Sequence, residues 1–208
     1  TQTLVQAGVL TKDIDTVLRS TANFAQATET SLSVAADVIT SLRDVYKDMS
    51  DAKLADQLTK TINLSKLTGE GLKTIVSLGA QVGSSYGLES EQFLAASAVL
   101  RNAGLKESTV GTGLRQAILE MFSPDRKTTA ALEKRYAELG ETLTGPEIQK
   151  KFNGFTKEAS PLIAVLKELR RLGLGGEGDS AFSRIFDIRA ANAIKALVTN
   201  LEDLEATE

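Results

Sequence analysis

The stretch Ala98–Pro124, AVLRNAGLKESTVGTGLRQAILEMFSP, decides the fold of this 208-residue chain. Asn102-Ala103-Gly104 predicts the end of one helix, because glycine adopts the left-handed conformation that follows a helix without the strain that a Cβ brings. Ser108 or Thr109 can cap a second helix, and Ser123-Pro124 ends that helix and begins another. The apolar residues of the second helix share one face at helical spacing: Val110, Leu114, Ala117, Ile118, Met121 and Phe122. The stretch therefore predicts a helical hairpin.

Four glycines stand inside predicted helices. Gly111 and Gly113 fall in the second helix of the hairpin, where each costs about 1 kcal/mol relative to alanine. Such a cost indicates close approach of another backbone, although a frayed first turn explains it as well. Gly79 and Gly83 are four residues apart, so they share one face of an earlier helix and can admit a neighbouring helix.

Turn and cap residues predict helices along the whole chain. Residues 1–10 read as the tail of an earlier helix that stops at Gly8. The following helices begin at Thr11, Ser31 or Ser33, Ser50, Thr68, Glu89, Ser108 or Thr109, Pro124, Pro146, Pro161, and Asp179 or Ser180, the last one running to about Leu204. All three prolines stand at predicted helix starts, where proline loses no hydrogen bond. We therefore predict an all-α fold, a bundle of about eight to ten short amphipathic helices with no sheet.

The predicted domain organisation is a single helical module, residues 1–208, of a longer protein. A division into sub-parts 1–87 and 88–208 stays open, and the glycine-rich residues 173–178 are a predicted linker. The chain begins Thr-Gln-Thr-Leu-Val-Gln, without an initiator Met or the basic start of a signal peptide. We expect a piece of a longer polypeptide, although processing or cloning would give the same start.

The composition excludes several classes of function. The chain has no Cys and no His, which removes disulfides, the common zinc sites, Ser–His and Cys–His catalysis and histidine pH switches. Aromatic residues make up only 5%, which suits helix packing better than a sheet. No apolar run approaches the roughly 18 residues of a membrane span. We assign no catalytic, cofactor-binding or metal-binding residue, and we expect no enzymatic activity.

The central stretch resembles the core region of phage tail tape measure proteins. The matching residues are Asn102-Ala103-Gly104-Leu105, Ser108, Gly111-Thr112-Gly113-Leu114-Arg115 and Ser123-Pro124. The similarity extends from about residue 12 to residue 200 and includes Leu139-Gly140 and Ile185-Phe186. One departure is Asp187, which stands where the family usually has glycine.

This resemblance implies a structural protein of the virion. Tape measure proteins are long, mostly helical chains that lie in the lumen of the tail, set its length during assembly and leave ahead of the DNA. The implied partners are tail-tube, tail-tip or baseplate proteins, tail assembly chaperones and further copies of the same chain. The implied location is the virion tail, with assembly in the host cytoplasm. Since Gly and Pro interrupt this segment often, we expect a folded module rather than the straight part of the ruler.

Three motifs suggest alternative functions. Glu89-Ser90 is similar to the start of lytic transglycosylase motifs, so a tail-associated peptidoglycan hydrolase stays open, although acidic residues are also favoured in a helix's first turn. Gly173–Gly178 satisfies the dinucleotide fingerprint, but that fingerprint works only after a buried strand, and a linker is the better interpretation. The pairs Arg126-Lys127 and Lys150-Lys151 are short and lack interleaved aromatics, so we expect no specific nucleic-acid recognition. A general helical scaffold or adaptor unrelated to phage also stays open.

Overall fold

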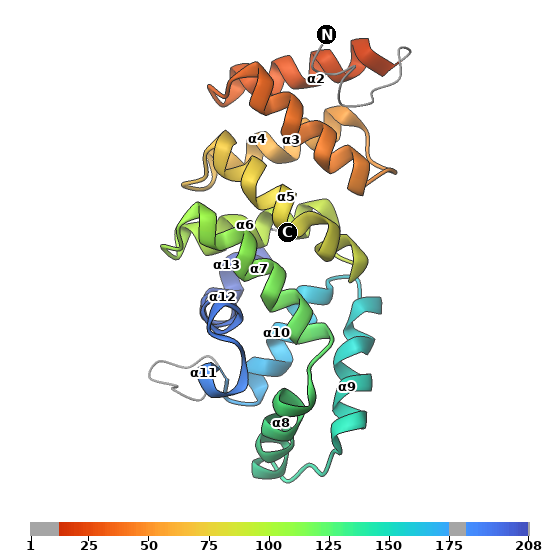
Figure 1. Ribbon diagram of the computed structural model, residues 1–208, viewed down its shortest axis with the longest axis vertical. Helices are drawn as coiled ribbons and strands as arrows, with labels where there is room; N and C mark the ends of the chain where they lie inside the picture. Colours follow the sequence, from red (N-terminus) through yellow and green to blue (C-terminus); the bar gives the residue numbers. More distant parts are fainter. Residues whose placement is uncertain (1–12, 175–181, 208) are drawn as a thin grey trace.

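The computed structural model of the chain describes residues 13–174 and 182–207 (Figure 1). Within these ranges the structure is all-α, with twelve α-helices and no strand. In chain order the helices are α2 (Ile14–Ala27), α3 (Leu32–Val45), α4 (Asp51–Asn63), α5 (Gly69–Ser85), α6 (Ser90–Asn102), α7 (Glu107–Phe122), α8 (Arg126–Glu138), α9 (Gly145–Gly154), α10 (Pro161–Arg171), α11 (Phe182–Ile185), α12 (Ile188–Thr199) and α13 (Leu201–Thr207), with a short 3-10 helix η2 at Phe155–Lys157.

The predicted count of eight to ten helices is wrong. Eleven of the twelve described helices have seven residues or more, and the excess comes from the segment that was expected as one helix up to Leu204. Asp187 breaks that segment because its carboxylate accepts a hydrogen bond from the backbone N–H of Arg189 and caps α12. Asn200 breaks it again, since its side chain donates to the carbonyl of Ala196 and ends α12. The predictions for residues 1–10, Gly8, Thr11, Asp179 and Ser180 lie outside the described residues.

The helix caps follow the sequence at most positions. Ser31, Ser50 and Thr68 each accept a hydrogen bond from a first-turn backbone N–H, which confirms three predicted starts. The cap predicted at Ser108 or Thr109 is wrong, because α7 begins at Glu107, before either residue. Pro124 is not at the first position of α8 either: Asp125 follows it and caps the helix.

The helices stack in layers along the long axis of the molecule (Figure 1). The helix α2 packs on α3 and α4, α3 packs on α5, α5 on α7, and α7 on α12. The pair α8 and α9 forms the end opposite α2. The chain then returns, so that α13 contacts α6 and α10 near the middle. The buried apolar residues form one cluster that extends from Val17 in α2 to Leu204 in α13.

The crossing of α5 and α7 at the centre of this stack depends on glycine. A Cβ on Gly111 would lie 3.0 Å from the Cα of Ile75 and 3.1 Å from Cδ1 of Leu78. A Cβ on Gly79 would lie 3.0 Å from the ring of Phe93 and 3.6 Å from the carbonyl oxygen of Gly111. On the α12 side of α7, a Cβ on Gly113 would lie 3.4 Å from that of Ala193. The structure therefore confirms close backbone approach at Gly111, whereas Gly79 and Gly83 leave room for the ring of Phe93 in α6.

We predict that Gly111→Ala lowers the free energy of unfolding by about 1–2 kcal/mol, because the added methyl must displace the α5 backbone. That figure is the net change: the strain from the added methyl exceeds the stabilisation of roughly 1 kcal/mol that alanine brings to a helix interior relative to glycine. The matched control is Gly154→Ala at the end of α9, where a Cβ would meet nothing within 4 Å and stability should stay equal or rise by about 0.4–1 kcal/mol. Urea titrations followed by circular dichroism measure both variants, and equal stability of the two would contradict the proposed crossing constraint.

Candidate functional site

The structure gives Glu89 a structural role. Glu89 is the N-cap of α6, where its side chain accepts from the backbone N–H of Gln92. The side-chain Oε1 of Gln92 in turn accepts from the backbone N–H of Glu89 at 3.1 Å, completing a capping box. The amide nitrogen of Gln92 donates to the carbonyl of Ala159 at 2.9 Å, which joins this cap to the segment before α10. Glu89 is exposed, whereas a glycosidase acid works from a cleft that shields it from water.

A hollow of about 440 Å³ does lie beside Glu89, lined by Val45–Met49, Ser84 and Gly87–Glu89. Its one large aromatic residue, Tyr46, is only 8% exposed, and the hydroxyl has no hydrogen-bond partner among the described residues. Burial, and then the nearby charge of Glu89, raise the pKa of Tyr46 above its usual value. The phenol of Tyr46 is therefore neutral at pH 7, and the carboxylate of Glu89 is engaged in the capping box.

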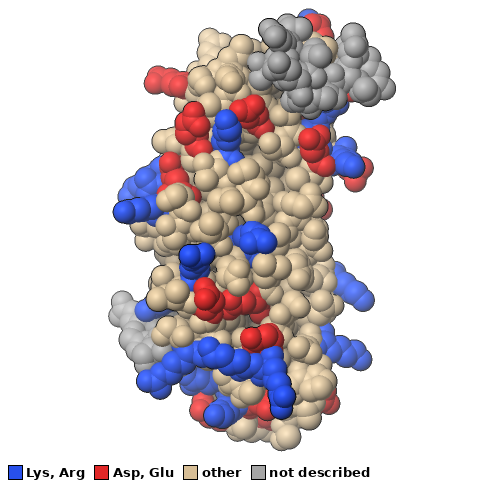
Figure 2. Space-filling view, viewed as in Figure 1, with Lys and Arg blue, Asp and Glu red and all other residues tan. Residues whose placement is uncertain are grey.

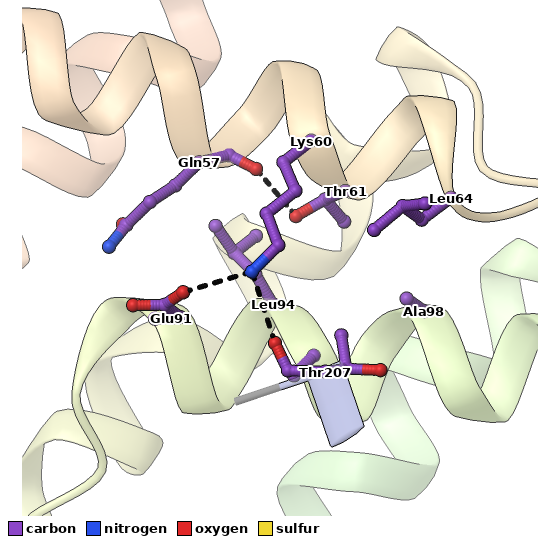
Figure 3. Close-up of a pocket in the computed structure, with 9 residues that line it drawn as sticks. Gln57, Lys60, Thr61, Leu64, Glu91, Leu94, Ala98 and Thr207 are labelled. Atoms are coloured by element: carbon purple, nitrogen blue, oxygen red, sulfur yellow. Dashed lines mark hydrogen bonds and ion pairs between the residues drawn. The ribbon is translucent and has the colours of Figure 1, made fainter. Parts of the chain in front are cut away.

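The candidate interaction site is a groove where α4, α6 and α13 meet (Figure 3). A cavity of about 20 Å³, room for a single water molecule, lies between Thr61 of α4, Leu64 just after α4, Leu94 and Ala98 of α6, and the end of α13. An open hollow of about 440 Å³ continues from it along α6 towards Asn102. The floor of this groove is made of small apolar side chains of α6.

Lys60 bridges the three helices across this groove (Figure 3). Its Nζ lies 3.2 Å from Oε1 of Glu91 in α6 and donates to the carbonyl oxygen of Thr207, also at 3.2 Å. Both partners suit the helix dipoles, because Glu91 stands in the first turn of α6 and Thr207 in the last turn of α13. No local pattern in the sequence marks Lys60, since its partners are 31 and 147 residues away.

A second polar cluster surrounds Glu168 of α10, whose side chain is 11% exposed. Its Oε1 accepts from the hydroxyl of Tyr136 in α8 at 2.6 Å and lies 2.6 Å from Nζ of Lys151 in α9. Arg171 donates to both carboxylate oxygens, at 2.8 and 2.9 Å. Burial acts to raise the pKa of Glu168, but hydrogen bonds from the two cations and the tyrosine outweigh it and lower that pKa to about 2. The cluster joins α8 and α9 to α10.

The surface carries both signs of charge over most of the face in Figure 2, with a band of basic side chains over α8 and α11. Of the basic residues singled out in the sequence, Lys151 belongs to the Glu168 cluster. Arg126, Lys127 and Lys150 form no ion pair with a described carboxylate.

Across the ranges 13–174 and 182–207 there is no group of three residues arranged to hold a metal ion. The same residues include no helix long and apolar enough to cross a membrane.

The glycine-rich segment is described only at its start. Gly173 has φ +72° and ends α10 as a left-handed cap. Residues 175–178, which complete the fingerprint and the predicted linker, lie outside the described residues. A dinucleotide site follows a buried strand, whereas the described part of this segment follows the helix α10.

Comparisons with known proteins agree with the resemblance in the sequence. The family model described as phage-related minor tail protein matches residues 1–198. A protein of Escherichia phage P2 named "Probable tape measure protein" is 23% identical over 198 residues. That alignment covers 90% of this chain but 23% of the phage P2 protein, so the chain spans about a quarter of the length of this relative. No solved structure matches the chain.

We predict that Glu168→Gln lowers the free energy of unfolding at pH 7 by about 1–3 kcal/mol, because it removes the charge that Lys151 and Arg171 share. The pKa of Glu168 in the folded chain, about 2, is below its ordinary 4.5, so the stabilisation is complete above about pH 5 and is lost as the pH falls towards 2. The difference between wild type and variant should shrink over that window.

Urea titrations at pH 7, 5, 4, 3 and 2.5 measure this difference. The control is Glu138→Gln, which changes an exposed carboxylate of α8 and should alter stability by no more than about 0.5 kcal/mol at any pH. A difference for Glu168→Gln that stays constant with pH would contradict the assignment.

Proposed function

This chain belongs to the family of phage-related minor tail proteins, and from that membership we propose that it is a folded module of a tape measure protein that takes part in tail assembly and in setting tail length. The observation that carries the proposal is the extent of the match, since the family model covers residues 1–198 of 208. The name of the phage P2 relative supports the same role.

The layered fold supports a module that contributes to the tail as a compact unit. One continuous helix of 208 residues would extend about 310 Å at 1.5 Å per residue. Here the chain turns back at Gly87, Gly104 and Gly140, each with positive φ, and stacks its helices. We therefore assign the straight part of the ruler to other regions of the longer protein. The module would lie in the tail lumen and leave the tail ahead of the DNA.

The proposed partners are those of a tail component: tail-tube proteins, tail-tip or baseplate proteins, tail assembly chaperones and further copies of the chain. The role is structural and not enzymatic, a proposal supported by the engagement of Glu89 in the α6 capping box. The groove between α4, α6 and α13 is an open surface available to another element.

The test in the phage is an in-frame deletion of the codons for residues 13–207, with tails measured by negative-stain electron microscopy. We expect normal heads with missing tails or tails of altered length, because the module is needed to start or complete the tube. The Gly154→Ala phage, which changes a position with open space around it, should have normal tails. Tails of unchanged length and number after the deletion would rule out the role.

The test in solution is light scattering of the purified chain, alone and with each tail-tube, tip or baseplate protein and chaperone. A defined complex with one of them supports the role and locates the module along the tail. A monomer that binds none of them would favour the general helical scaffold instead.

A further inference from the structure

Helix α13 is held to the rest of the molecule by two buried leucines and by exposed polar contacts. Only two of its seven side chains, Leu201 and Leu204, are buried. Glu202 accepts two hydrogen bonds from the guanidinium of Arg170, at 2.6 and 3.1 Å. Glu205 lies 2.5 Å from Nζ of Lys167. Both cations belong to α10, and the Glu202 and Lys167 side chains are more than half exposed, so these ion pairs meet water and salt.

The other end of α13 depends on Lys60 of α4. The ammonium group donates to the carbonyl oxygen of Thr207, and it shares its charge with Glu91 (Figure 3). The Lys60 side chain is 50% exposed, so this contact is also open to solvent. Three cations, one from α4 and two from α10, therefore contact this seven-residue helix.

The packing beneath α13 is incomplete. The 20 Å³ cavity lies under Thr207, and the 440 Å³ hollow runs beside Asp203 and Ala206 along the α6 face. Both spaces open to solvent, so α13 packs against α6 along only part of its length. The apolar contribution that keeps α13 closed comes from its two leucines.

A single residue joins α13 to the helix before it. Asn200 has φ −107° and ψ 35°, outside the helical region, and its side chain closes the last turn of α12 by donating to the carbonyl of Ala196 at 2.7 Å. The end of α12 is therefore satisfied without α13. The short helix can turn about Asn200 while α12 keeps its hydrogen bonds.

We propose that α13 is a salt-sensitive latch, which opens about Asn200 and uncovers the small apolar side chains of α6 along the groove. The ion pairs of Lys167 with Glu205 and of Arg170 with Glu202 close it, together with the hydrogen bond from Lys60 to the carbonyl of Thr207. Added salt weakens the two ion pairs because the Debye length falls from about 10 Å at 0.1 M to about 3 Å at 1 M. Local opening of this kind is typical of elements with few buried contacts and exposed fastenings. The proposal concerns only this chain and holds whether or not the chain sets tail length.

Cysteine labelling tests the latch, because the chain has no cysteine and an introduced thiol is the only one that reacts. The probe is Leu204→Cys in α13 and the matched control is Leu197→Cys in α12, since both leucines are fully buried. We expect the thiol at 204 to react at least about tenfold faster than the thiol at 197 in 0.1 M NaCl, and several-fold faster again in 1 M NaCl. The control should not respond to salt.

A second set of variants connects the salt response to the ion pairs. Glu202→Gln with Glu205→Gln, added to Leu204→Cys, should speed labelling in 0.1 M NaCl to the rate that the single variant reaches in 1 M NaCl. Hydrogen exchange on the unmodified chain covers the case in which Leu204→Cys disturbs folding: amides of residues 203–207 should exchange faster than those of 192–198, and faster in salt. Equal labelling at 204 and 197, or equal exchange in the two segments, would overturn the proposal.

Discussion

The close approach of α5 and α7 is the contact on which the rest of the stack depends. Gly111 lets the backbone of α7 lie against Ile75, and Gly71 leaves the space into which the carboxylate of Glu107 fits. That carboxylate accepts hydrogen bonds from the backbone N–H and the hydroxyl of Thr68, at 2.8 and 3.1 Å, so it joins the starts of the two helices. Since α5 carries the layers towards α2 and α7 carries those towards α12, this crossing positions both halves of the stack.

Polar clusters hold the layers that lie far from this crossing. At the end of the stack, the Glu168 carboxylate gathers the hydroxyl of Tyr136 and the cations of Lys151 and Arg171 from α8, α9 and α10. In the middle, Lys60 connects α4 to α6 and α13. The Glu168 side chain is 11% exposed and the Lys60 side chain 50% exposed, so salt screens the contacts of Lys60 more than those of Glu168.

Local chemistry explains why part of this structure was predictable. Ser31, Ser50 and Thr68 cap helices through contacts within three residues, and Gly104 and Gly140 end helices by adopting positive φ, so the sequence contains all that these features need. The start of α7 was missed because Glu107, rather than a local hydroxyl, is fixed there by contact with α5. The breaks at Asp187 and Asn200 were missed because apolar periodicity continues through them and only the caps interrupt the helix.

The sequence alone predicts that the chain is helical, where many of its helices begin and end, and which family it resembles. The helix boundaries depend on residues within a few positions of one another. Only the tertiary structure decided which helices lie side by side, that Glu89 caps a helix beside an open hollow, and that Lys60 and Glu168 collect partners from distant segments. These pairings depend on long-range packing and on charge brought together in space, for which a single sequence has no periodic signal.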